Sequence, residues 1–280
     1  MERIKLAIEK AKNGDLALVS ARDSAANTSR QEPVSDSVQT HSLPPDSIQY
    51  RKTEVVPLDD SHLERHRVIA HQKTHPASWA FDVLRTQVLQ QMEEKGWRTL
   101  AITSPSGESG KTLVAINLAM SIAQQTNRTA LLVDFDLRRP KVAANLGLQR
   151  KTSLNEVLED GVDVALAMVN PGLERLVVLP TDRPVPKAAE VLASARVREL
   201  ISELRDRYGD RIVIFDLPPI LVADDVMAVL PQVDCVLLVV GSGASSEKEI
   251  EEAMMRLSKA QLLGLVLNKD DAPMHSSYYY

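Results

Sequence analysis

Apolar strands alternate with helical segments over most of the chain, from about residue 77 onward. Runs rich in Val, Ile and Leu, typical of buried strands, occur at 99–104, 129–135, 176–180, 211–216, 235–240 and 262–268. Helices are expected between most of these runs, with one at 74–95 before the first strand and a last one at 247–259. Because continuous apolar strands are buried on both faces, this alternation predicts an α/β fold with a three-layer, mostly parallel twisted sheet and helices on both faces.

The remaining residues divide into flanking segments. A short amphipathic helix is expected at residues 1–13, since apolar residues recur there at helical spacing, and it would dock on a partner or pack on its own domain. Residues 14–54 contain many Ser, Asp, Gln, Thr and Pro, which predicts a disordered linker. Residues 55–76 are interpreted as a lead-in segment to a domain at 77–272, and residues 273–280 as a tyrosine-containing tail.

A phosphate-binding loop is predicted between the first apolar strand and the helix that follows it. In such a loop the backbone N–H groups and the positive end of the helix surround a phosphate, Lys111 contacts the β/γ-phosphates, and the Thr112 hydroxyl binds Mg²⁺. Pro105 stands where the full pattern has its first glycine and lacks an N–H, so Gly107 is the candidate for the turn. The candidate nucleotide contacts are Ser106, Gly107, Glu108, Ser109, Gly110, Lys111, Thr112, Leu113 and Asn268.

Two further strands end in acidic residues. The strand at 129–135 leads to Asp134 and Asp136, which would project to the same side of an extended chain. The strand at 211–216 ends at Asp216, which is interpreted as a Walker B aspartate. Open α/β sheets bind ligands beyond the carboxyl ends of their strands, and Mg²⁺ prefers carboxylate oxygens. The alternative is that these aspartates only cap strands as turn residues.

Charge and composition narrow the class of function. A net charge of −5 argues against general nucleic-acid binding. A local basic group, formed by Arg138, Arg139 and Lys141, is expected to face phosphate, with a solvated surface as the alternative. Cys235 lies in an apolar run and is interpreted as a buried strand residue. No run approaches the roughly 18 apolar residues of a membrane-spanning helix, which favours a cytosolic protein.

Histidines gather between residues 62 and 75, where four of the six in the chain lie. His62 and His66 are four residues apart, as two metal ligands on a helix could be. Because no cysteine or compact set of carboxylates completes a site, we interpret these histidines as a surface group.

Four motifs follow one another along the chain in an order that resembles one family of proteins. The motifs are Ser-Gly-Glu-Ser-Gly-Lys-Thr at 106–112, Val-Asp-Phe-Asp-Leu-Arg-Arg-Pro at 133–140, Val-Ile-Phe-Asp-Leu-Pro-Pro at 213–219 and Leu-Gly-Leu-Val-Leu-Asn-Lys at 263–269. With the tyrosines at the end, they are similar to the bacterial P-loop tyrosine kinases of capsule and exopolysaccharide synthesis, relatives of the Mrp, MinD and ParA ATPases. The likeness covers roughly residues 77–280. It implies an ATP- and Mg²⁺-dependent kinase that autophosphorylates a C-terminal tyrosine cluster.

The same resemblance implies partners and a location. A membrane-embedded polysaccharide chain-length or export protein would recruit the chain to the inner face of the cell membrane. Family members often assemble into rings through a helix carrying Glu-x-x-Arg-x-x-Arg, for which the matching positions here are Trp79, Asp82 and Arg85. Only the last arginine is retained, so self-association is possible but stable rings are not expected.

Roles for the candidate residues follow from the chemistry of phosphoryl transfer, which depends on positioning and charge neutralisation. Thr112 and Asp134 would organise Mg²⁺, and Asp216 would hold a metal-bound water. Asp134 is the candidate base for the incoming hydroxyl, with Asp136 as the alternative. The phosphoacceptors would be Tyr278, Tyr279 and Tyr280.

Alternatives remain at this stage. A regulatory ATPase of the MinD or Mrp kind, without tyrosine kinase activity, would share these motifs, and so would an inactive adaptor. Residues 268–271 match the N-K-x-D guanine signature, but only nine residues follow, too few for the rest of a guanine pocket. ATP is therefore expected, with Asn268 near the adenine.

Overall fold

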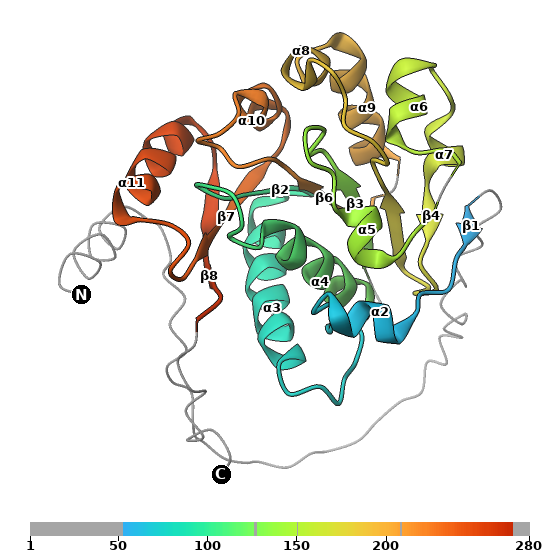
Figure 1. The fold of residues 1–280 in the computed structure, drawn as a ribbon, viewed down its shortest axis with the longest axis horizontal. Helices are drawn as coiled ribbons and strands as arrows, with labels where there is room; N and C mark the ends of the chain where they lie inside the picture. The colour runs from blue at the N-terminus through green and yellow to red at the C-terminus, as the bar shows by residue number, and fades with distance from the viewer. Residues whose placement is uncertain (1–52, 126–127, 150, 208, 271–280) are drawn as a thin grey trace, which may run out of the picture.

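An eight-stranded sheet runs through the part of the chain that the computed structural model describes, residues 53–125, 128–149, 151–207 and 209–270 (Figure 1). Its strands are β1 (Glu54–Val55), β2 (Thr99–Thr103), β3 (Thr129–Asp134), β4 (Val169–Asn170), β5 (Leu176–Leu179), β6 (Arg211–Asp216), β7 (Cys235–Gly241) and β8 (Leu262–Asn268). The spatial order is β1-β4-β5-β3-β6-β2-β7-β8. Every neighbouring pair is parallel except β4 and β5.

Helices connect the strands and cover both faces of the sheet (Figure 1). They are α2 (Asp60–Arg65), α3 (Ser78–Lys95), α4 (Lys111–Ala123), α5 (Val142–Leu146), α6 (Leu154–Glu159), α7 (Val164–Ala167), α8 (Ala188–Leu192), α9 (Ala195–Asp206), α10 (Asp225–Val229) and α11 (Glu247–Arg256). Short 3₁₀ turns follow α10 at Leu230–Gln232 and α11 at Leu257–Lys259.

Two apolar cores separate the layers. Side chains of α3 and α4, such as Met92 and Leu118, pack on one face of the sheet. Side chains of α9 and α10, such as Leu200 and Val226, pack on the other. Alternate residues of β6 serve opposite cores, which explains why this strand is apolar at successive positions. The predicted three-layer α/β fold is confirmed.

The predicted strands are all present, and two short ones were missed. β1 and β4 have two residues each, too few to produce a hydrophobic period. β1 spans the last residue of the expected linker and the first of the lead-in segment and pairs with β4, so the lead-in segment extends the sheet. The expected helix at 1–13, almost all of the expected linker and the tail at 273–280 lie outside the described residues.

One aspartate joins two neighbouring strands at the amino-terminal edge of the sheet. The Asp234 carboxylate, just before β7, accepts hydrogen bonds from the backbone N–H groups of Arg98 and Thr99 and from the Thr99 hydroxyl, each at 2.8 Å. The Asp234 N–H in turn donates to the Thr99 hydroxyl oxygen at 2.7 Å. These bonds join the start of β2 to the start of β7.

Two expectations about composition can be compared with the structure. Cys235 is buried in β7, as predicted, and burial raises the pKa of its thiol, so the thiol stays protonated. Among the helices in the described ranges, none combines the length and the apolar character needed to cross a membrane.

Candidate active site

Five of the predicted site residues, Lys111, Thr112, Asp134, Asp136 and Asp216, meet at the carboxyl edge of three adjacent strands. β3, β6 and β2 are neighbours in the sheet, and Asp216 at the end of β6 lies in register with both Asp134 of β3 and Ile102 of β2. The phosphate loop follows β2 and leads into α4. The topology therefore brings together the ends of β2, β3 and β6 and the start of α4, although about a hundred residues separate the first of these segments from the last.

The phosphate loop uses left-handed backbone at two residues. Glu108 has φ 63° and Gly110, which precedes α4, has φ 87°. Gly107 lies in the turn, as expected, but it has no left-handed φ and a Cβ built there meets nothing within 4 Å, so the turn does not require a glycine at this position. The left-handed turn instead falls on a residue with a side chain, where it is strained.

Neighbouring strands support this loop from the side. The Asn268 amide, at the end of β8, donates to the Ser109 carbonyl at 2.9 Å. A Cβ on Gly110 would lie 2.2 Å from Asn268 Nδ2, and a Cβ on Gly241 would lie 3.0 Å from Ser109 Cα. Gly241 was missed by sequence reasoning, although a glycine at the end of an apolar strand is a signal of close backbone approach.

Lys111, the first residue of α4, lies within a cluster of buried acids. Its Nζ is 2.8 Å from Asp136 Oδ2 and 3.4 Å from Asp216 Oδ1, and its side chain is only 11% exposed. Burial disfavours the ammonium ion, but Asp216 and Asp136 outweigh burial and raise the pKa of Lys111 above the ordinary lysine value. Lys111 therefore remains charged.

Thr112 and Asp216 form the next contact in the cluster. The Thr112 hydroxyl donates to Asp216 Oδ2 at 2.6 Å, and the Asp216 side chain is fully buried. Burial raises the pKa of Asp216, and the nearby Lys111 only partly offsets this effect. A threonine hydroxyl and a carboxylate thus lie side by side at the start of α4.

Asp134 and Asp136 do not share one extended strand as expected. β3 ends at Asp134, whose Oδ2 accepts hydrogen bonds from the backbone N–H groups of Lys141 and Val142 at 3.1 and 3.0 Å. Asp134 Oδ1 accepts from the Asp136 N–H at 3.2 Å. Burial and the nearby Asp216 raise the pKa of Asp134 well above the ordinary value. Asp134 therefore holds the loop after β3, and Asp136 is the acid that reaches Lys111.

The three basic residues after β3 do not all lie as either expectation, a phosphate-facing group or a solvated surface, would have them. The Arg138 guanidinium makes a bidentate pair with Asp225, with Nε 2.7 Å from Oδ2 and Nη2 2.8 Å from Oδ1. Asp225 is fully buried at the start of α10, so Arg138 is held by the protein. Arg139 and Lys141 are exposed and agree with the solvated alternative. Asp225 was missed because nothing in the sequence links it to Arg138.

The histidines make contacts within the fold. The rings of His62 and His66 stack with their centroids 4.1 Å apart, and His62 Nε2 lies 2.8 Å from the carbonyl oxygen of Ala144 in α5. Within the described ranges, no group of three or more His, Cys, Asp or Glu side chains is arranged to hold a metal ion. At the carboxyl edge, Lys111 lies between Asp136 and Asp216, so this cluster is an ion-pair network in the present structure.

The helix that carries the expected ring-forming positions uses its arginine internally. Arg85 Nη1 donates to Asp82 Oδ1 at 2.6 Å and to Ser121 Oγ at 3.1 Å. Trp79 is 58% exposed. The one arginine retained from the motif is therefore engaged within its own subunit.

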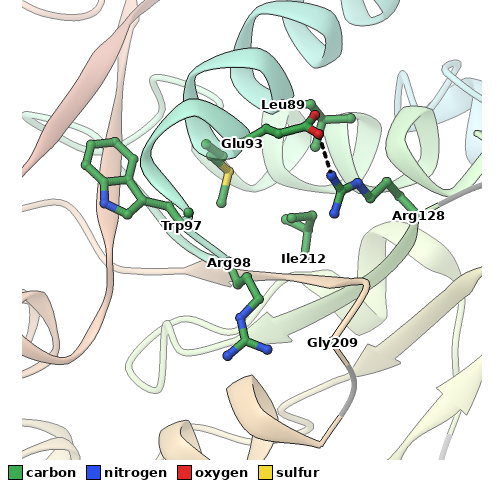
Figure 2. A pocket seen from close by; sticks show the side chains of 9 residues that line it. Leu89, Glu93, Trp97, Arg98, Arg128, Gly209 and Ile212 are labelled. Atoms are coloured by element: carbon green, nitrogen blue, oxygen red, sulfur yellow. Dashed lines mark ion pairs between the residues drawn. The ribbon is translucent and has the colours of Figure 1, made fainter.

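A separate cavity of about 200 Å³ opens near the amino-terminal ends of the strands, opposite the cluster around Lys111 (Figure 2). Leu89 and Ile212 contribute apolar side chains to it, and Arg98 also lines it. An ion pair at 3.4 Å joins Arg128 to Glu93 of α3. Because Arg98, Arg128 and Ile212 lie just before or at the start of β2, β3 and β6, this cavity is distinct from the cluster around Lys111.

Comparisons with known proteins agree with this geometry. A family model described as an AAA domain matches residues 97–265. The tyrosine-protein kinase YwqD of Bacillus subtilis (strain 168) is 30% identical over 222 residues, which cover 79% of this chain and 92% of YwqD.

Solved structures give the same result. The kinase domain of the Escherichia coli tyrosine kinase Etk matches with a TM-score of 0.68 and 29% identity, over 81% of this chain and 94% of that domain. The chimerical protein CapA2B2 matches with a TM-score of 0.67 and 26% identity, over 78% of this chain and 93% of the other. The chain therefore belongs to the bacterial tyrosine-protein kinases with an AAA-type nucleotide-binding domain.

Proposed function

We propose that this chain is an ATP- and Mg²⁺-dependent tyrosine autokinase that acts in the polymerisation or export of capsule or exopolysaccharide. The observation that carries the proposal is the buried cluster around Lys111, where its ammonium contacts Asp136 and Asp216 at the start of α4. Family membership supports nucleotide binding and tyrosine kinase activity. The polysaccharide pathway rests on resemblance.

The chemistry of the donor set fits a nucleotide with its metal ion. The first N–H groups of α4 have no acceptor within the helix, and Gly110 before it has the left-handed φ of 87° that leads the loop into the helix. Thr112 and Asp216 offer the oxygen ligands that Mg²⁺ prefers. Bound Mg²⁺ would neutralise phosphate charge. Three buried carboxylates against one ammonium leave the cluster acidic enough to favour such a cation.

Each residue of the cluster then has a task. Lys111 would exchange its contact with Asp136 for the β/γ-phosphates. Asp136, released in this way, would accept the proton of a tyrosine hydroxyl at Oδ2. We favour Asp136 over Asp134 as the base, because backbone N–H groups already occupy both oxygens of Asp134. Asp134 would instead keep the loop after β3 in position.

The proposed phosphoacceptors are Tyr278, Tyr279 and Tyr280, which lie outside the described residues. Their segment follows Asp270, directly after the carboxyl end of β8. This end lies at the edge of the phosphate loop, since Asn268 contacts Ser109. We propose transfer between molecules in a transient complex.

Incubation of the purified, phosphatase-treated chain with ATP and Mg²⁺, followed by mass spectrometry, tests the kinase. We expect phosphate on one or more of the three tyrosines, and none in Lys111→Met. The exposed Lys248→Met serves as the matched control and should retain activity. Robust ATP hydrolysis without tail phosphate would support the regulatory ATPase instead, and absence of both would support the inactive adaptor.

ATP is proposed over GTP as the nucleotide. Asp271, which completes the guanine-like signature, lies outside the described residues, and the Asn268 amide contacts the Ser109 carbonyl. Asn268 is proposed to lie near the adenine while it braces the loop. Competition binding with ADP and GDP decides the question, because a clear preference for GDP would overturn this assignment.

A membrane-embedded polysaccharide chain-length or export protein is the proposed partner, at the inner face of the cell membrane. The similarity to the chimerical protein CapA2B2 and to Etk supports a shared type of assembly. The chain should join the membrane fraction only when such a protein is co-expressed. Tight binding of the isolated chain to vesicles of phosphatidylglycerol and phosphatidylethanolamine would contradict this proposal.

A further inference from the structure

The strand β8 forms an open edge of the sheet. It is the last strand in the spatial order, and within the described part of the chain no strand pairs with its outer side (Figure 1). Its seven residues, Leu-Leu-Gly-Leu-Val-Leu-Asn, include no charged residue and no proline. Leu265 is 47% exposed and Leu267 is 60% exposed.

Proteins rarely leave an apolar, uncharged edge strand exposed to solvent. Sheet edges expose backbone N–H and C=O groups, and proteins generally protect them with lysine, proline, a bulge or a covering segment. The one irregularity here, at the Val236/Leu237 step of the pairing with β7, leaves the later residues of β8 in regular register. The exposed leucines lie in that regular part, so the edge is suited to another extended segment.

We propose that the tail of this chain occupies the edge, with residues 274–280 pairing antiparallel to β8 as a ninth strand. The described chain ends at Asp270, two residues beyond β8, so the tail begins beside its binding surface. Lys269 has a left-handed φ of 61°, which bends the chain directly after the strand. Ten residues follow Asp270, enough for a turn and a strand as long as β8. Tyrosine also favours strands.

The docked tail has a consequence that rests on the proposed function. An antiparallel strand of seven residues runs about 23 Å back along β8. It therefore carries Tyr278–Tyr280 toward the amino edge of the sheet, away from Lys111. While the tail is docked, the acceptor tyrosines stay away from Lys111, so only a released tail can be phosphorylated. Each phosphate adds about −1.5 to −2 charges, which disfavours return to an apolar edge.

Hydrogen exchange of the β8 amides tests the docking without any need for kinase activity. The experiment uses phosphatase-treated chain without ATP, and compares the unmodified protein with Ser276→Pro and Ser277→Pro. Alternate residues of a strand donate to the partner, so one of these two prolines must remove a ladder hydrogen bond. Ser276→Ala and Ser277→Ala are the matched controls, and a chain ending at Asp270 gives the fully undocked reference.

We expect the outward-facing amides of β8 to exchange about tenfold more slowly in the unmodified chain than in the shortened one. At least one proline variant should lose this protection, and both alanine variants should keep it. Equal exchange in all variants would overturn the docking. Protection that survives in the shortened chain and rises with protein concentration would assign the edge to a second copy instead. A docked tail that is never phosphorylated would contradict the proposed kinase while leaving the docking intact.

Discussion

The two ends of the central strands both carry aspartates, but they use them differently. At the amino edge, Asp234 accepts three hydrogen bonds from Arg98 and Thr99, all from neutral backbone and hydroxyl groups. At the carboxyl edge, Asp216 and Asp136 contact the buried ammonium of Lys111. At the amino edge, backbone and hydroxyl groups of the chain satisfy the carboxylate. At the carboxyl edge, several carboxylates lie close to one another around a single ammonium.

This difference distinguishes Asp234, which joins two strands, from the carboxylates of the proposed site. A charge held by several hydrogen bonds from nearby backbone stabilises a strand connection. Burial, and after it the like charge of a neighbouring carboxylate, raises the pKa of an acid such as Asp134, and a further cation would relieve this effect. We therefore expect substitutions at the amino edge to change stability, and those at the carboxyl edge to change activity first.

The largest expected effect is the loss of turnover in Lys111→Met. Removing the charge that is proposed to contact the phosphates should lower phosphoryl transfer by more than about 100-fold. Tail phosphorylation and ATP hydrolysis measure it, with Lys248→Met as control and thermal unfolding as a check on folding. Turnover close to that of the unmodified chain would remove Lys111 from the proposed site.

At the amino edge, Asp234→Ala should lower the free energy of unfolding by about 2–4 kcal/mol, because three donors lose one acceptor. Urea denaturation measures this loss. All three bonds go to the same oxygen, so Asp234→Asn can keep an acceptor in that position and should cost less. Turnover per folded molecule should not change. A fall in turnover without a fall in stability would contradict the comparison.

An intermediate effect is expected for Arg138, which belongs to the carboxyl edge but is paired by the protein. Arg138→Ala leaves the buried Asp225 without its bidentate partner, and the half-exposed arginine limits the cost. A double-mutant cycle with Asp225→Asn should give a coupling energy of about 1–2 kcal/mol. Coupling near zero would show that this pair contributes nothing to the position of α10.

The smallest expected effect is a pH dependence that comes from Asp134. Its raised pKa means that the folded chain binds this proton more tightly than the unfolded chain does. The free energy of unfolding should therefore fall as the pH rises from about 4 toward the raised value. Asp134→Asn should make this fall shallower, by about 1 kcal/mol between pH 4.5 and 7.

Urea midpoints across that range measure the slope, with the exposed Asp160→Asn as control. Burial opposes the charge of Glu156, but hydrogen bonds from Arg183 and Ser153 lower its pKa to about 2, so its own contribution is lost only below about pH 4. Lys111 contributes stability that is lost only as the pH rises above the ordinary lysine pKa toward its raised pKa, outside this range. An unchanged slope in Asp134→Asn would mean that Asp134 is charged in the folded chain.

Much of this protein could be predicted from residues that are close in sequence. Long apolar runs such as 211–216 and 235–240 indicated the parallel sheet, because burial on both faces requires them. Lys111, Thr112 and Asp216 were found because a strand, a loop and a helix in this order place phosphate-binding groups at one edge. The two-residue strands β1 and β4 left no such periodic signal.

The sequence by itself determined the layers of the fold, the identity of the phosphate loop and the set of acids near it, since each depends on local pattern. Only the tertiary structure decided which acid reaches Lys111, that Arg138 belongs to Asp225, and that Glu108 rather than Gly107 takes the left-handed turn. Each of these depends on contacts between segments far apart in the chain, or on the competing demands of burial and hydrogen bonding, which spacing along a strand does not encode.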